Sequence, residues 1–451
     1  MNISKTAMGR IARGLGLWLG LPGLLLTLGA CVKNAPETRP DVIATPPLSV
    51  TFVPQKGDFI SQYGAPLSVA DVAAMAKGYD YILIGEGHRN PVDHQVQQAL
   101  LQALSGDGDG LSLGLEMIAV DKQQELDDFC KGQVDLDGLP GELDWAKNWG
   151  YDFNMFREHF AIAKRNGVPV AGLNVPSEVT RKIARQGIDS LTDEEKALLP
   201  KDIVPPSTDQ LAFLNAVMSM HKDRDAADPQ ERERFRLVQS IWDSKMAEEA
   251  VRLRKQYDWP VLIVAGDAHV EYGWGIAKRL RWYDPSARVL TIVPWRGDEF
   301  DSEAGDVFFY SPDTYRSRMG MVLSGRIGGG ILVESVARGS RADRAGLRPG
   351  DVLVEAAGVP LDELMSLHMA GTKAHDADAS LIFKVQRGDQ TLNVDMGKLG
   401  QHRPVVKPKP AAEPTPAPAP ATKAAPQAAT DASAESATGA EAVQAPSQEA
   451  R

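Results

Sequence analysis

The sequence predicts an α/β fold, with a mostly parallel sheet covered by helices on both faces, followed by a small β-rich domain. Short apolar runs alternate with amphipathic helical patterns across residues 65–300, which is typical of a parallel sheet. Several of these runs end in polar residues, as strands do where they meet at a ligand-binding edge. A separate glycine-rich series of shorter runs begins near residue 315.

The N-terminal residues 1–30 have the features of a secretory signal peptide. Basic residues precede a short apolar run over residues 15–28, and Leu28-Gly29-Ala30-Cys31 resembles a bacterial lipobox. We therefore expect lipid attachment at Cys31, which would become the mature N-terminus. Because Val32 is not the aspartate associated with inner-membrane retention, we predict a lipid-anchored protein of the cell envelope, in the outer membrane of a Gram-negative bacterium.

Composition limits the partners of the chain. Its formal net charge is −11, which argues against general nucleic-acid binding. With Cys31 lipidated, Cys130 has no partner within the chain, so we predict no disulfide. Residues 31–54 are predicted as a linker, and the Pro/Ala-rich residues 402–451 as a disordered tail.

The first strand–helix unit carries the most informative loop of the chain. The apolar run Tyr81–Ile84 predicts a buried strand, and Asn90-Pro91 predicts a helix start. Between them lies Gly85-Glu86-Gly87-His88, which places a carboxylate and an imidazole directly after the strand. The pattern predicts further strands at 111–116, 168–173, 260–265 and 288–293, and helices at 121–129, 152–166, 209–220, 232–257 and 273–281.

Polar side chains follow several of the predicted strands. Glu86 and His88 follow the first strand, Glu116 and Asn174 end the next two, and His269 follows the fourth. Because the carboxyl ends of parallel strands share one edge of a sheet, we expect these side chains to converge.

Three kinds of chemistry remain open from the residues alone. His88, His269, Glu86 and Glu116 could hold a divalent metal such as zinc. The same residues could act in general acid–base catalysis without a metal. A histidine or tyrosine at this edge could instead be an axial ligand of haem.

Several motifs resemble one known family. Gly85-Glu86-Gly87-His88, Leu115-Glu116-Met117, Leu173-Asn174-Val175-Pro176 and Gly266-Asp267-Ala268-His269 follow, in order, the pattern of the ChaN-like iron-regulated lipoproteins of the haem-binding-uptake and Tiki superfamily. The resemblance covers about residues 55–300. It implies a ChaN-like, erythromycin-esterase-like fold and a surface lipoprotein that binds haem for iron uptake, cofacially in a homodimer.

The same resemblance implies an enzymatic alternative. Relatives in the wider superfamily use the corresponding histidine and glutamate positions for metal-dependent peptide or ester hydrolysis. If this chain is an enzyme, Glu86, His88, Glu116 and His269 would be its catalytic residues.

One position departs from the family pattern. Relatives commonly have a tyrosine on the helix that corresponds to residues 152–166, and Phe156 stands there in this chain. A phenyl ring cannot ligate iron. The candidate haem-binding residues are therefore His88, His159, His269, Tyr272 and Tyr151.

Residues 317–398 resemble a bacterial PDZ domain, after a predicted linker at 301–316. The signature is the run Ala345–Leu353, which contains Gly346, Pro349-Gly350 and Asp351. PDZ domains bind the C-terminus of a peptide by strand addition, with backbone amides holding the carboxylate. The resemblance assigns this carboxylate loop to Gly320, Met321 and Val322, which implies protein C-termini as partners. A third reading of the chain is an envelope scaffold that acts through this domain alone.

Overall fold

The computed structural model describes residues 49–106, 108, 110–219 and 229–400. The predicted signal peptide, the lipidation site Cys31, most of the linker 31–54 and the tail 402–451 lie outside the described residues. Within the described part of the chain, no helix combines the length and apolarity needed to cross a membrane.

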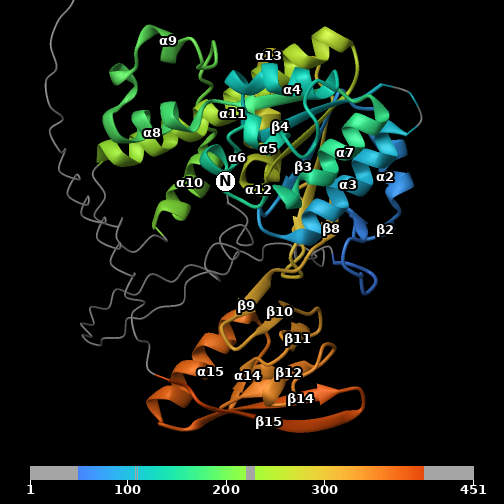
Figure 1. The fold of residues 1–451 in the computed structure, drawn as a ribbon, viewed down its shortest axis with the longest axis vertical. Helices are drawn as coiled ribbons and strands as arrows, with labels where there is room; N and C mark the ends of the chain where they lie inside the picture. The colour runs from blue at the N-terminus through green and yellow to red at the C-terminus, as the bar shows by residue number, and fades with distance from the viewer. Residues whose placement is uncertain (1–48, 107, 109, 220–228, 401–451) are drawn as a thin grey trace, which may run out of the picture. The chain divides into compact units, whose positions relative to one another are not determined.

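The first domain is built on an eight-stranded sheet in the order β2-β1-β8-β7-β3-β6-β4-β5 (Figure 1). Strands β8, β7, β3, β6, β4 and β5 run parallel, whereas β1 is antiparallel to β8 and to β2. The predicted α/β class is confirmed. The strands are β1 Phe59–Ser61, β2 Pro66–Leu67, β3 Tyr81–Glu86, β4 Ser112–Ala119, β5 Val170–Asn174, β6 Val261–Gly266, β7 Val289–Trp295 and β8 Val307–Tyr310.

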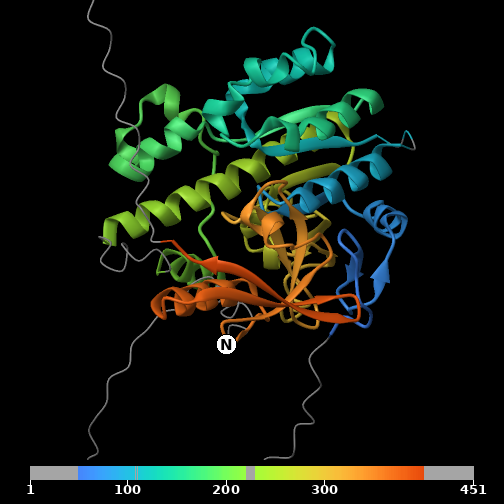
Figure 2. The same ribbon diagram turned by 60° about the horizontal axis from the view of Figure 1, so that its bottom comes forward.

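Helices cover both faces of this sheet, and α11 is the long helix across one face in Figure 2. The longer helices are α2 Val69–Ala76, α3 Pro91–Ser105, α4 Gln123–Cys130, α7 Arg157–Asn166, α8 Ser177–Gln186, α10 Thr208–Ser219, α11 Pro229–Tyr257 and α13 Ile276–Tyr283. The one-turn helices are α5 Leu139–Glu142, α6 Trp145–Asn148, α9 Asp193–Lys196 and α12 Asp267–Val270.

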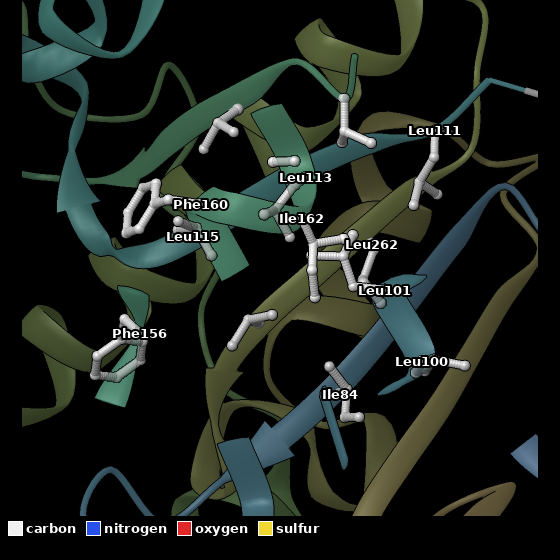
Figure 3. Close-up of a cluster of buried hydrophobic side chains, with 14 of the residues drawn as sticks. Ile84, Leu100, Leu101, Leu111, Leu113, Leu115, Phe156, Phe160, Ile162 and Leu262 are labelled. Atoms are coloured by element: carbon white, nitrogen blue, oxygen red, sulfur yellow. The ribbon is translucent and has the colours of Figure 1, made fainter. Parts of the chain in front are cut away.

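Alternate side chains of β3 enter two separate cores, because successive residues of a strand point to opposite faces. Ile82 and Ile84 pack with residues of α2, α3, α4 and α7, a cluster that Figure 3 shows around Ile84 and Phe160. Tyr81 and Leu83 pack with residues of α11 and α13. This two-sided burial explains why the strand is an unbroken apolar run.

The helix predicted over residues 152–166 is interrupted at Phe156. Phe153–Met155 forms a 3-10 turn, and α7 begins only at Arg157. Phe156 is buried, and its ring centroid lies 4.5 Å from that of His94. The helix ends at Gly167, whose φ of +67° is the left-handed conformation that glycine adopts readily.

The predicted linker 301–316 contains β8 and the first three residues of β9. β8 lies beside β7 in the first sheet, and β9 Thr314–Ser317 belongs to a second, seven-stranded sheet. That sheet has its own core around Leu323, Leu353 and Phe383. Its other elements are β10 Met321–Gly325, β11 Ile331–Val336, α14 Arg341–Arg344, β12 Val352–Ala356, β13 Val359–Pro360, α15 Leu364–Asp376, β14 Ser380–Arg387 and β15 Gln390–Lys398.

Candidate functional site

The candidate site lies where β3 and β6 end side by side. Glu86 at the end of β3 is in register with Gly266 at the end of β6. The chain then continues into α3 on one face of the sheet and into α12 and α13 on the other. Adjacent strands whose connections leave on opposite faces form the crevice in which open α/β sheets bind ligands.

A series of hydrogen bonds links His159 to His88, and we call it the Glu86 relay. The amide nitrogen Nε2 of Gln97 donates to Glu86 Oε2 at 2.9 Å. The amide oxygen Oε1 of Gln97 therefore accepts from His159 Nε2 at 3.0 Å. His88 Nδ1 donates to the other carboxylate oxygen, Glu86 Oε1, at 2.9 Å. Three elements contribute, since Glu86 ends β3, Gln97 lies on α3 and His159 lies on α7. The other ring nitrogen of His88, Nε2, takes no part in the hydrogen bonds of this relay.

A second series of the same form links Arg279 to His269, and we call it the Asp243 relay. Arg279 Nη1 donates to Gln210 Oε1 at 2.7 Å, and Gln210 Nε2 donates to Asp243 Oδ2 at 2.8 Å. His269 Nδ1 donates to Asp243 Oδ1 at 2.6 Å. The Arg279 and Asp243 side chains are both buried, so each charge is compensated inside the protein.

The two relays meet at Glu116 and Gly266. The backbone amide of Gly266 donates to Glu116 Oε2 at 2.6 Å, and His269 Nε2 lies 3.7 Å from Glu116 Oε1. A Cβ atom on Gly266 would lie 2.9 Å from Cε1 of His88 and 3.3 Å from its Nε2. A side chain at this position would therefore require the His88 ring to shift.

His88 is the most exposed member of the relays and is flanked by aromatic rings. Its side chain is 29% exposed. Its ring centroid lies 4.8 Å from that of Trp149 and 5.6 Å from that of Tyr151. The guanidinium of Arg89 lies 5.7 Å from the Tyr151 ring centroid. We call His88, Trp149, Tyr151 and Arg89 the aromatic wall.

The surroundings of the three site histidines shift their pKa values in different directions. Burial lowers the pKa of His269, but the charges of Glu116 and Asp243 outweigh burial and raise it to about 9. Burial also lowers the pKa of His88, but the hydrogen bond to Glu86 and the charge of Glu116 outweigh burial and raise this pKa. Burial, together with His94, lowers the pKa of His159 to about 3. His269 is thus a cation at neutral pH, and His159 is neutral.

The loop that carries His88 is held by a buried ion pair. Asp93 accepts from the backbone amide of Gly87 at 2.7 Å and from Arg296 Nη1 and Nη2 at 3.0 and 2.9 Å. His94 Nε2 donates to the backbone oxygen of His88 at 3.2 Å. Both contacts fix the backbone of the loop and leave the His88 ring to the site.

The structure brings most of the predicted site residues together. Glu86, His88, Glu116 and His269 converge, and Tyr151 lies against His88. His159 is fully buried and reaches the site only through Gln97. Tyr272 donates its hydroxyl to Asp301 Oδ2 at 3.0 Å and stacks on Trp274, with ring centroids 4.3 Å apart.

The predicted divalent-metal site is not supported. Among residues 49–106, 108, 110–219 and 229–400, no group of three or more His, Cys, Asp or Glu side chains could hold a metal ion. In the structure, three of the four predicted ligands make hydrogen bonds to residues outside the predicted set. Glu86 accepts from Gln97 as well as from His88. Glu116 accepts from the amide of Gly266, and His269 donates to Asp243.

The sequence prediction missed the far half of the Asp243 relay. Gln210 carries no local signal, since it lies on a helix far from any predicted strand end. Arg279 had one signal, because it falls on the apolar side of α13 with Ile276 and Leu280. A charged residue at helical spacing among apolar residues indicates a buried, paired charge.

The family comparisons agree with both predicted domains. Residues 72–280 match the model of the family described as haem-binding uptake, Tiki superfamily, ChaN. Residues 332–387 match the model of the PDZ domain. No curated protein matches the chain. The predicted resemblance to the ChaN and PDZ families is therefore confirmed.

Three solved structures that match parts of this chain are the following. ChaN of Campylobacter jejuni, solved with cofacial haem, has 18% identity and a TM-score of 0.48, over 59% of this chain and 100% of that chain. The PDZ domain of HtrA3, bound to a phage-derived peptide, has 30% identity and a TM-score of 0.14, over 16% of this chain and 61% of that chain. A mutant of erythromycin esterase EreC has 11% identity and a TM-score of 0.31, over 52% and 76%.

Proposed function

We propose that the first domain binds haem at the carboxyl edge of its sheet. Residues 72–280 of this domain match the family described as haem-binding uptake, Tiki superfamily, ChaN, and a PDZ match follows at residues 332–387. The observation that carries this proposal is the aromatic wall, in which the Glu86 relay holds His88 beside Trp149 and Tyr151. It lies at the edge where an α/β sheet takes its ligand.

The residues of the wall fit the chemistry of haem. Haem supplies an iron that takes an imidazole or phenolate as axial ligand, and His88 and Tyr151 are the two such groups in the wall. The hydrogen bond from His88 Nδ1 to Glu86 fixes the tautomer and strengthens the imidazole as a ligand. Trp149 and Tyr151 offer apolar faces to a planar ring, and Arg89 offers a cation to its carboxylates.

Haem titration of the purified mature chain tests this proposal. We expect a shifted Soret band on binding, and at least a tenfold loss of affinity in His88→Ala or Tyr151→Phe, since each removes a ligand or a ring contact. His368→Ala and Tyr63→Phe are matched controls at exposed positions outside the aromatic wall. Equal affinity in all four variants, or no binding at micromolar haem, would contradict the proposal.

We further propose that the chain is anchored to the cell envelope through a lipid at Cys31, and that two haem-loaded copies form a homodimer. The lipobox resemblance supports the anchor. Cys31→Ser should move the protein from the membrane fraction to the soluble fraction and abolish labelling by palmitate. Sedimentation with and without haem tests the dimer, and an unchanged monomer in both would rule it out.

Metal-independent ester or peptide hydrolysis is a second candidate function. It is favoured by the two carboxylate–histidine pairs, Glu86–His88 and Asp243–His269, on either side of Glu116. His269, held as a cation, would donate a proton or stabilise an oxyanion. Release of nitrophenol from a panel of nitrophenyl esters, lost in His269→Gln, would support this function. Equal release by the wild type and the variant would exclude it.

A further inference from the structure

We propose that β9 occupies the peptide-binding edge of the PDZ sheet, so that a partner's C-terminus must displace this segment of the chain. The inference rests on the expectation from the sequence that the PDZ domain binds peptide C-termini, and it does not depend on haem. It concerns residues 314–325, where β9 pairs with β10, the strand that begins within the predicted carboxylate loop.

The strand order places β9 where an added peptide strand would lie. β10 begins at Met321, within the predicted loop Gly320-Met321-Val322, and it pairs with β11 on one side and with β9 on the other. A peptide can be added to β10 only on the side away from β11, because each strand has two edges. That edge is already paired, from Met321 with Ser317 to Ser324 with Thr314.

The direction of β9 also matches that of a bound peptide. A peptide whose carboxylate is held by the loop amides must end at the loop. β9 runs antiparallel to β10 and ends at Ser317, opposite Met321. The chain itself therefore presents its strand with the polarity that a ligand would have.

The carboxylate loop is engaged as well. The amide of Gly320, one of the three predicted to hold a carboxylate, donates to the backbone oxygen of Ser317 at 3.0 Å. The oxygens of Met319 and Gly320 accept from the amides of Ala342 and Ala337 at 2.9 and 2.8 Å. Residues 318–320 thus form a closed three-residue hairpin turn between β9 and β10, with Gly320 at φ +87° as this turn requires.

β9 is held mainly by this ladder of backbone hydrogen bonds. Thr314, Tyr315 and Arg316 are exposed, and Tyr315 is 49% exposed. Strands with little buried side-chain surface open locally at low free energy. A peptide can therefore displace β9. Because the peptide binds only while the edge is free, its apparent affinity equals its intrinsic affinity multiplied by the fraction of time that the edge is free.

Tyr315 and Arg316 have opposite roles in the ladder. Residues of an antiparallel strand alternate between pairs that exchange hydrogen bonds and pairs that do not. Since Ser317 closes the turn with a hydrogen bond, Tyr315 is the next residue bonded to β10, and the amide of Arg316 faces outward. Proline removes the amide hydrogen, so Tyr315→Pro breaks the ladder, whereas Arg316→Pro is tolerated on an edge.

Hydrogen exchange of the full chain tests the occupancy. We expect slow exchange of the β10 amide Leu323 in the wild type and in Arg316→Pro, and faster exchange in Tyr315→Pro. Unchanged exchange of Phe383 and Val385 on β14 would show that the PDZ core remains folded. Fast exchange of Leu323 in the wild type, or equal protection in Tyr315→Pro, would overturn the inference.

Fluorescence anisotropy with a labelled peptide tests the displacement. The probe is the segment Pro312–Ser317 made as a free peptide with a C-terminal carboxylate, and its C-terminal amide is the control. We expect Tyr315→Pro to bind the acid at least about tenfold more tightly than the wild type and Arg316→Pro do. Equal affinity for all three would overturn the inference. Faster exchange of Leu323 in Tyr315→Pro without peptide binding would leave the occupancy intact and refute the peptide binding expected of the PDZ domain.

Discussion

The Glu86 relay and the Asp243 relay use the same order of groups but carry different charge. Each joins a histidine through a carboxylate to a glutamine. Beyond the glutamine, the Glu86 relay ends in the neutral His159, whereas the Asp243 relay ends in the cation Arg279. The difference divides the tasks at the site. The Glu86 relay presents a partly exposed imidazole, and the Asp243 relay holds a buried, charge-balanced imidazolium.

Replacing Arg279, the cation at the end of the Asp243 relay, should have the largest effect on the free energy of unfolding. Arg279→Met removes one of the two cations beside the buried Asp243, leaving His269, and deprives the backbone oxygens of Val204 and Trp274 of a donor. We expect a loss of roughly 4 kcal/mol in the free energy of unfolding, measured by urea denaturation. Arg281→Met, an exposed arginine on the same helix, should change it little. Equal losses of stability in the two variants would contradict the difference in charge between the relays.

The imidazolium of His269 should make stability fall in alkali. Its pKa is raised to about 9 in the folded state, so its contribution is complete below its ordinary pKa of 6.5 and is lost as pH rises through 9. Between pH 6 and pH 9 we expect the free energy of unfolding to fall by roughly 3 kcal/mol from this group. His269→Gln should remove this slope. A slope that persists in the variant would mean that other groups cause it.

His159 should act in the opposite direction, in acid. Its pKa is lowered to about 3, so its contribution is complete above 6.5 and is lost as pH falls below that value. At pH 5 we expect a loss of about 2 kcal/mol relative to pH 8. His159→Gln should flatten the acid side of the urea-denaturation profile and leave the alkaline side unchanged. Flattening of both sides would show that the relays are coupled.

The smallest expected effect is at the meeting point of the relays. Gly266→Ala would place a Cβ atom against the His88 ring, so we expect a loss of about 1 kcal/mol in stability and weaker haem binding. Gly141→Ala is a matched control, because a Cβ atom there meets nothing within 4 Å. If Gly266→Ala binds haem as tightly as the control, the position of the His88 ring does not govern binding.

Much of the fold could be predicted because it depends on local patterns. The strands β3 and β6 are continuous apolar runs, and Asn90 caps α3 through its side-chain oxygen at 3.0 Å from the amide of Val92. β2 and β8 were missed for a physical reason. A two-residue strand has no periodicity, and Val307–Tyr310 becomes a strand only because β7 and β1 supply its hydrogen bonds.

The candidate site divides in the same way. The convergence of Glu86, Glu116 and His269 could be predicted, because strands of a parallel sheet end at one edge. The roles of Gln210 and Arg279 could not, because they depend on contacts with α11 across the fold. The same holds for the PDZ edge, where a segment predicted as linker pairs with β10.

The sequence by itself determined the alternation of strands and helices, the glycine-bordered loops and the residues at the strand ends, since each depends on neighbours along the chain. Only the tertiary structure decided the charge of the site. His159 and His269 are both buried histidines on helices, and their spacing says nothing about protonation. Their pKa values differ because Asp243, 26 residues away, and Glu116 surround one imidazole, whereas a neutral glutamine faces the other.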